Sequence, residues 1–391
     1  MLLDYEFFAP RRIVFGWGRR REIGSLARGL GRRAFLIRGS KTLESNGVFD
    51  EIAGLLAAQG VEPIEAAEIS HEPEVADVDR AARFLREHSR PETDLVLAVG
   101  GGSAMDLGKA AAALATNVDG ASVLEYLEGV GAGLRIARPP LPLIAMPTTA
   151  GTGSEATKNA VISSYDPPFK KSLRSDLMVP RAVLIDPELT VSLPAAATAW
   201  CGMDAITQLI ESYLSSRAKP IPQALALAGL ELAAPALIEA VADGGSRSAR
   251  EALAHAAILS GMALANSGLG LAHGVAAALG AHCRAPHGLA CAVMLPVAMR
   301  FNRPACEAPM ARLGAILTGR SWPAPSAAAD AAVDAVEQLC AAVHVPRRLS
   351  EIGVRREQIP DLVRGSQGNS MNGNPRPVTD AELTRLLEEM L

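Results

Sequence analysis

Short apolar runs alternate with amphipathic stretches through the first 190 residues of the chain. Six runs rich in aliphatic residues, several of them bounded by Gly or Pro, predict strands at 11–16, 32–39, 61–68, 94–102, 141–151 and 181–189. Apolar positions at i, i+3 and i+4 spacing predict helices between these strands, at 47–60, 77–88 and 103–116. Strands separated by helices of this length indicate βαβ units and a mainly parallel sheet.

The pattern changes near residue 190. Before it, residues 158–175 predict an antiparallel hairpin that turns at Asp166-Pro167-Pro168. From about Ala195 onward only helical periodicity is found, at 196–216, 222–243, 248–266, 287–302, 309–319 and 328–344, and a capping box from Thr379 to Glu382 opens a final helix. The sequence therefore predicts an α/β domain with a mainly parallel sheet at 1–190 and an all-α domain at 191–391.

Composition narrows the class of protein. A length of 391 residues with 49% hydrophobic residues suits two domains with ample cores, and a net charge of −4 without a basic stripe argues against nucleic acid as a partner. No apolar run is long enough to span a membrane, and no leader pattern opens the chain. Five cysteines without a CxxC pair indicate reduced thiols. We expect a cytoplasmic protein with a small-molecule substrate and, by default, a homodimer.

Two loops of glycine and hydroxyl residues follow consecutive predicted strands. The first is the run GGGS that contains Gly101, Gly102 and Ser103, and the second is PTTAGTGSE, which contains Thr148 and Thr149 and, further on, Thr152. Either loop alone is compatible with an ordinary tight turn. Together they favour one nucleotide that lies across both, because glycines let backbone N–H groups approach a pyrophosphate at a helix N-terminus.

A second group of polar residues lies in the helical half. His273 and His287 are fourteen residues apart in an otherwise apolar run, and Asp204 precedes Gln208 by one helical turn. Residues at i and i+4 share one face of a helix. These four side chains form a candidate metal site.

The whole chain resembles the iron-containing (group III) alcohol dehydrogenase family. GGGSAMDLGK, PTTAGTGSE and LAHGVAAALGAHCRAPHG are similar to family motifs and occur in the family's order, as do the two ends of the chain, RRIVFGWG and GNSMNGNPRPVTDAEL. The resemblance implies an NAD(P)-dependent dehydrogenase with a divalent metal in the cleft between its domains. It makes residues 1–190 the NAD(P)-binding domain and residues 191–391 the domain that carries the metal and substrate. It implies a pyrophosphate loop at 101–103, and cofactor contacts at Thr148, Thr149, Thr152, Asn159 and Lys171.

The metal ligands implied by the resemblance are only partly present. Asp204, His273 and His287 match three of the family's four ligands, but Gln208 stands where the family has His, and Ala277 stands where members often have a further active-site His. A Gln oxygen is a weaker ligand than imidazole. We expect Asp204, Gln208, His273 and His287 to bind Fe²⁺ or Zn²⁺, and proton transfer to run through water or ribose hydroxyls; no catalytic side chain is assigned.

Residues after the second predicted strand bear on the choice of dinucleotide. NAD-using members have an acidic residue there, which repels a 2′-phosphate. This chain has Arg38, then Gly39, Ser40 and Lys41, and its first carboxylate is Glu44. We therefore expect NADP(H) to be favoured over NAD(H), with Gly39, Ser40 and Lys41 near the cofactor.

The function indicated is hydride transfer between a nicotinamide dinucleotide and an alcohol or an aldehyde or ketone, and reduction is expected if NADPH is the partner. Two alternatives stay open on the sequence. One is a metal-independent reductase of the maleylacetate type. The other is a nucleotide-binding protein that has lost catalysis, which the combination of Gln208 and Ala277 would favour.

Overall fold

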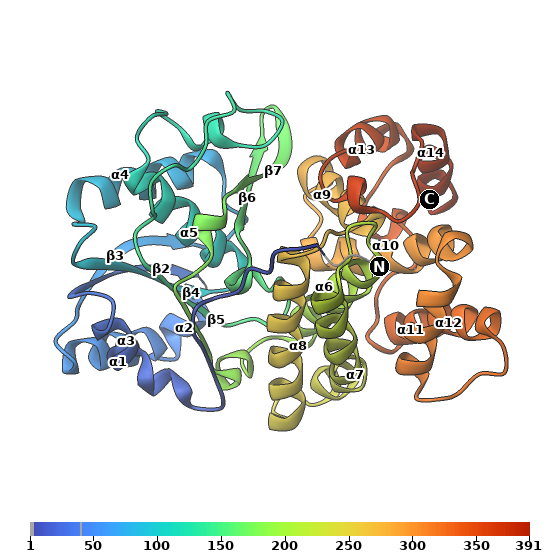
Figure 1. Ribbon diagram of the computed structural model, residues 1–391, viewed down its shortest axis with the longest axis horizontal. Helices are drawn as coiled ribbons and strands as arrows, with labels where there is room; N and C mark the ends of the chain where they lie inside the picture. Colours follow the sequence, from blue (N-terminus) through green and yellow to red (C-terminus); the bar gives the residue numbers. More distant parts are fainter. Residues whose placement is uncertain (1–3, 40) are drawn as a thin grey trace.

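The computed structural model describes residues 4–39 and 41–391. Figure 1 shows a half built around a sheet beside a half built from helices. The main sheet has six parallel strands in the order β1-β8-β5-β4-β2-β3. The strands are β1 Ile13–Phe15, β2 Arg33–Gly39, β3 Glu62–Ile69, β4 Asp94–Gly100, β5 Leu143–Pro147 and β8 Ala182–Ile185. The predicted parallel sheet is confirmed.

Side-chain alternation along the strands builds two cores, one on each face of the sheet. In β2, Phe35 and Ile37 join the core under α4 (Val75–His88) and α5 (Gly102–Thr116), which continues into the helical half. Ala34 and Leu36 of the same strand face α1 (Ile23–Arg28) and α3 (Val48–Ala58). Successive strand residues point to opposite faces, so the middle of a strand covered on both sides is a continuous apolar run. Two short elements, α1 and α2 (Lys41–Ser45), were not predicted, because so few residues carry little periodicity.

The predicted hairpin is also confirmed. β6 (Asn159–Tyr165) pairs antiparallel with β7 (Pro168–Arg174), with Tyr165 opposite Pro168 at the turn. This two-stranded sheet contacts α5 on one side and α9 on the other, and it stands between the two halves in Figure 1. It therefore positions residues of the α/β half against the helical half.

The helical half begins after β8, and no strand follows β8 in the described residues. Its helices are α6 Ala195–Leu214, α7 Pro220–Ala242, α8 Arg247–Ala265, α9 Leu271–Cys283, α10 His287–Asn302, α11 Glu307–Thr318, α12 Pro325–Ala342, α13 Ile359–Ser366 and α14 Asp380–Glu389. The capping box at Thr379 and Glu382 opens α14 as predicted. The exact boundary at residue 190 between two domains stays a prediction.

One helix, α7, is long and apolar enough to cross a membrane by length and composition, with a mean hydropathy of 1.7. Core helices of soluble proteins pass the same criterion. Here α7 packs along both α6 and α8, and its buried residues join the core of the helical half. That packing accounts for the buried part of its apolar surface, whereas Ile221, Leu232 and Ile238 are exposed.

Candidate active site

The two predicted nucleotide loops meet at the carboxyl edge of the sheet. The strand order reverses between β2 and β4, which is where parallel α/β sheets bind ligands. Gly100 ends β4 at φ +154°, and a Cβ atom there would lie 3.0 Å from the Cα of Gly39 at the end of β2. On the other side, a Cβ atom on Gly102 would lie 2.8 Å from Cγ2 of Thr152. Side chains are excluded at this edge, so the N-terminus of α5 remains open to a ligand.

A buried lysine fixes one loop to the other. Lys109 on α5 is 2% exposed, and its Nζ donates to the backbone oxygen of Ser154 at 2.8 Å and to the hydroxyls of Ser154 at 2.7 Å and Thr157 at 2.8 Å. Its Nζ lies 3.1 Å from Oδ1 of Asp106, and Oδ2 of Asp106 accepts a hydrogen bond from the N–H of Val161 at 2.9 Å. Burial lowers the pKa of Lys109, although Asp106 opposes this shift. The pair joins α5 to the PTTAGTGSE loop and to β6.

A cleft of about 650 Å³ extends from these loops into the helical half. Residues of the α/β half that line it include Gly102, Ser103, Thr152, Asn159 and Lys171. Residues of the helical half that line it include Gln208, His273, Ala277 and His287. Nine of the positions singled out in the sequence thus face one cavity, which is of the size that holds a small ligand or cofactor.

Other predicted cofactor residues lie at the edge of this cleft or behind it. Thr148 is buried and its N–H bonds the backbone oxygen of Gly100, while Thr149 lies against Gly101. Gly39 lies beside Gly100. Ser40 is outside the described residues, as is the side chain of Lys41.

Asn159 supplies an observation that points to a ligand. Asn159 lines the cleft, and its Oδ1 atom is buried and has no hydrogen-bond partner. A buried acceptor without a partner costs free energy unless a ligand or water satisfies it. A hydroxyl or carboxamide of a dinucleotide in the cleft would do so, so the residues present fit this cofactor.

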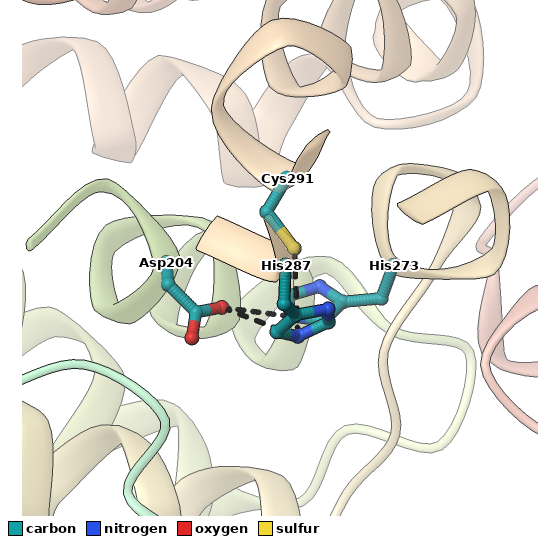
Figure 2. A group of neighbouring side chains, drawn as sticks. All are labelled: Asp204, His273, His287 and Cys291. Carbon is teal, nitrogen blue, oxygen red and sulfur yellow. Dashed lines mark hydrogen bonds and ion pairs between the residues drawn. The ribbon is translucent and has the colours of Figure 1, made fainter. Parts of the chain in front are cut away.

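Three helices converge to form the candidate metal centre. Asp204 lies in the middle of α6, His273 lies in the first turn of α9, and His287 is the first residue of α10 after Pro286. Oδ1 of Asp204 is 3.3 Å from Nε2 of His273 and 3.7 Å from Nε2 of His287. Figure 2 shows these side chains pointing toward one another, together with Cys291. The three strongest predicted ligands are therefore brought together.

The charge state of this cluster suits a cation. Burial, reinforced by Lys170, lowers the pKa of His287 to about 4, so its imidazole is neutral and has a free lone pair. Burial would raise the pKa of Asp204, yet its hydrogen bond with His273 holds that pKa below its usual value, so the carboxyl is ionised. Burial likewise opposes protonation of His273, but the neighbouring Cys291 and the hydrogen bonds with Asp204 and Glu211 raise its pKa well above the usual value. A metal would replace the proton of His273.

Glu211 orients His273. Its Oε2 lies 2.6 Å from Nδ1 of His273, and its Oε1 accepts a hydrogen bond from the N–H of Ala272 at 2.7 Å. Nδ1 of His273 therefore carries its proton toward Glu211, and Nε2 faces Asp204. A carboxylate behind a histidine ligand is the arrangement that fixes imidazoles at metal sites. The chemistry of the donor set fits a divalent metal.

Gln208, the weakest predicted ligand, lines the cleft beside Asp204. Its Nε2 donates to Oδ1 of Asp204 at 3.2 Å, and its Oε1 accepts from the hydroxyl of Ser260 at 2.7 Å. An amide NH₂ group has no lone pair for a metal. Coordination by Gln208 therefore requires the amide to turn over, and its assignment as a ligand stays a prediction.

Replacing Glu211 with Gln is expected to lower metal affinity by about 10- to 100-fold, the usual effect of losing such an outer partner. The neutral amide would polarise the imidazole less and would place an NH₂ group near the N–H of Ala272. Competition with a chromophoric chelator measures the change. Ser212→Ala on the same helix is the matched control, because the buried Ser212 hydroxyl has no partner to lose; equal affinities in the two variants would contradict the assigned role.

Sequence reasoning missed three residues of this site. Glu211 lies seven residues after Asp204 and Cys291 lies four after His287, so helical spacing placed both on the relevant faces. Lys109 stood inside a quoted motif without an assigned role. Helical periodicity could have indicated the first two residues, but only the packing of three helices shows which neighbours they meet.

The fold and the site define a dinucleotide-dependent oxidoreductase with a metal centre between an α/β half and a helical half. Comparison with known proteins gives its family. Residues 10–187 match the family described as iron-containing alcohol dehydrogenase, and residues 198–391 match its C-terminal counterpart.

Individual proteins that are similar to this chain support the same family assignment. Long-chain-alcohol dehydrogenase 1 of Geobacillus thermodenitrificans is 33% identical over 386 residues, covering 96% of each chain. NAD-dependent methanol dehydrogenase of Bacillus methanolicus is 30% identical and covers 99% of this chain and 100% of its own. A solved 1,3-propanediol oxidoreductase has a TM-score of 0.90 at 30% identity, covering 99% of this chain and 100% of its own.

The chain belongs to the iron-containing alcohol dehydrogenase family, whose enzymes interconvert alcohols and carbonyl compounds by hydride exchange with a nicotinamide dinucleotide. The predicted family, fold class and enzyme class are confirmed.

Proposed function

We propose that this enzyme works as a metal-dependent reductase of small aldehydes or ketones, with NADPH as the hydride donor and Fe²⁺ or Zn²⁺ as the metal. The observation that carries the proposal is that His273 and His287, which face the buried Asp204, line the same cleft as Gly102, Ser103 and Thr152 of the two loops. A homodimer and a cytoplasmic location remain predictions from the sequence.

The residues of the cleft have separate tasks in this reaction. The bound metal supplies a Lewis acid that stabilises negative charge on the substrate oxygen. The N-terminus of α5, at Gly102 and Ser103, would receive the pyrophosphate, and Asn159 would satisfy its buried oxygen on the cofactor. Ala277 offers no proton donor, so the proton of the product alcohol would come from water or a ribose hydroxyl.

Metal removal tests this function directly. Protein purified without added metal is analysed for its metal content and assayed for NADPH oxidation with a panel of short and long aldehydes, before and after chelation and again after addition of Fe²⁺ or Zn²⁺. Loss of turnover on chelation and its recovery with one metal are expected. Unchanged turnover in metal-free protein would instead indicate the metal-independent reductase of the maleylacetate type. Tight NADPH binding without any turnover would indicate a protein that has lost catalysis.

The residues at the end of β2 and just after it support the preference for NADP(H). No carboxylate occurs in residues 38–43, and the only side-chain charge described in that turn is Arg38, whose guanidinium lies 3.3 Å from Glu44 and within 3.6 Å of Glu65 and Glu68. We expect kcat/KM to be higher with NADPH than with NADH. The opposite order would refute this preference and leave the reductase function intact.

A carboxylate added to this turn should reverse the preference. Ser40→Asp is expected to lower kcat/KM for NADPH by about 100-fold or more, because juxtaposed like charges cost several kcal/mol. NADH, which lacks the 2′-phosphate, should be little affected. Ser40→Asn has nearly the same shape without the charge and serves as the control; equal losses in the two variants would show that shape rather than charge is responsible.

A further inference from the structure

Cys291 is a fourth donor at the metal centre that the family motifs do not supply. It is fully buried on α10, one turn after His287. Its Sγ lies 3.7 Å from Nε2 of His287, and one ligand atom from each of Asp204, His273, His287 and Cys291 lies within 4.8 Å of the others. Figure 2 shows the sulfur directed at the two imidazoles, on a different side from the carboxylate.

The separations of these atoms match those of ligands around one ion. Tetrahedral zinc has Zn–N and Zn–O bonds of about 2.0–2.1 Å and Zn–S bonds of about 2.3 Å. Two N or O ligands are then ~3.3 Å apart, and a sulfur and a nitrogen ligand are ~3.6 Å apart. The observed distances are 3.3 Å from Asp204 to His273 and 3.7 Å from Cys291 to His287. The other separations, 3.7 Å from Asp204 to His287 and up to 4.8 Å within the group, are wider, so the sulfur comes within bonding distance of a shared ion when the donors draw together around it.

The amide of Gln208, one turn after Asp204 on α6, uses both its NH₂ group and its oxygen in hydrogen bonds within the protein. Gln208 donates its NH₂ group to Asp204 and accepts from Ser260 through its oxygen. It supports the carboxylate in this arrangement and leaves a coordination position for another residue.

We propose that Cys291, rather than Gln208, is the fourth protein ligand, so that this enzyme holds its metal with Asp204, His273, His287 and a thiolate. This inference rests on the proposed metal-dependent function. The thiol loses its proton to solvent as sulfur binds the metal, which is not itself oxidised or reduced. A thiolate makes the site softer and favours Zn²⁺.

The cleft stays open to substrate in this arrangement. Cys291 and Asp204 are buried and do not line the cleft, whereas His273 and His287 do. The thiolate would therefore bind on the buried side of the metal. A substrate oxygen can approach from the cleft, since catalytic zinc can expand to five ligands.

Cobalt substitution tests the sulfur ligand without relying on activity. The metal of the full-length enzyme is exchanged for Co²⁺, the Co²⁺ content is measured, and the near-ultraviolet thiolate-to-cobalt charge-transfer band is recorded. The band is expected in the unmodified enzyme at one Co²⁺ per chain. The band should disappear in Cys291→Ser. It should persist in two controls: Cys201→Ser, which removes the thiol one turn before Asp204 on α6, and Cys340→Ser, which removes a buried thiol on α12. Zn²⁺ affinity should fall at least about 10-fold in Cys291→Ser, because even an outer partner contributes that much.

The outcomes separate this inference from the function on which it rests. One Co²⁺ per chain without a charge-transfer band in the unmodified enzyme overturns the thiolate ligand, leaves the metal-dependent function standing and returns Gln208 as the fourth ligand. A band that persists in Cys291→Ser also overturns it. No bound Co²⁺ or Zn²⁺ at all defeats the metal-dependent function and this inference with it. The spectrum of the unmodified enzyme shows whether any thiolate binds the metal, and the Cys291→Ser and Cys201→Ser variants show which cysteine supplies it.

Discussion

Replacing Asp204 with Asn is expected to lower kcat/KM by about 10³-fold or more and to leave the protein unable to retain a metal. Asp204 is the only carboxylate of the four clustered donors, and both histidines face its Oδ1 atom. A Lewis acid supplies several kcal/mol of transition-state stabilisation, and each ~1.4 kcal/mol corresponds to a tenfold change in rate. Metal content by elemental analysis and steady-state rates with an aldehyde measure both effects.

Thr207→Val is the control for this substitution. Thr207 is buried on the same helix, but its hydroxyl bonds the backbone oxygen of Met203 within α6. Valine has nearly the same volume, so metal content and turnover should remain close to those of the unmodified enzyme. Full turnover in Asp204→Asn, with circular dichroism showing both variants folded, would exclude a catalytic metal at this position.

Replacing Lys109 with Met is expected to have the largest effect on stability, a loss of about 3–5 kcal/mol, the usual result of removing one partner of a buried ion pair. Methionine fills most of the space but leaves Asp106 without its cation, and removes the ammonium donor from the backbone oxygens of Ser154 and Asn159. The free energy of unfolding from denaturant titration gives the loss.

Lys109→Met should also weaken binding of the dinucleotide, because the Lys109–Asp106 pair holds α5 against the PTTAGTGSE loop. A lower affinity for NADPH, measured by fluorescence titration below the unfolding transition, is expected to accompany the lower stability. Arg356→Met is the control: it removes the exposed ion pair with Glu388 and should leave both quantities little changed. Equal stability of the two variants would show that the buried pair does not hold the loops together.

Several parts of the structure could be predicted from local patterns in the sequence. The middles of β2 and β4 are continuous apolar runs because helices cover both faces of the sheet, and α6 and α12 carry the 3.6-residue repeat. The two loops could be predicted because glycine and hydroxyl residues follow consecutive strands. Asp204, His273 and His287 could be proposed because the motifs around them resemble one family in the same order.

Other features depend on contacts between residues far apart in the chain. Lys109 meets the loop around Ser154 only after β4 and β5 have paired, since 45 residues separate the two. Glu211 reaches His273 across 62 residues, when α6 packs beside α9 and α10. No local periodicity encodes such a meeting.

The sequence by itself determined the parallel α/β half, the helical half, the candidate nucleotide loops and three of the candidate metal ligands, because these follow from periodicity, turn chemistry and motif order within short segments. Only the tertiary structure decided which donors gather at the candidate metal centre. It turned the amide of Gln208 toward Asp204 and directed the sulfur of Cys291 at the histidines. The reason is physical: coordination depends on distances of a few ångströms between helices, and those distances are set by the packing of α6, α9 and α10 rather than by the spacing of residues along any one of them.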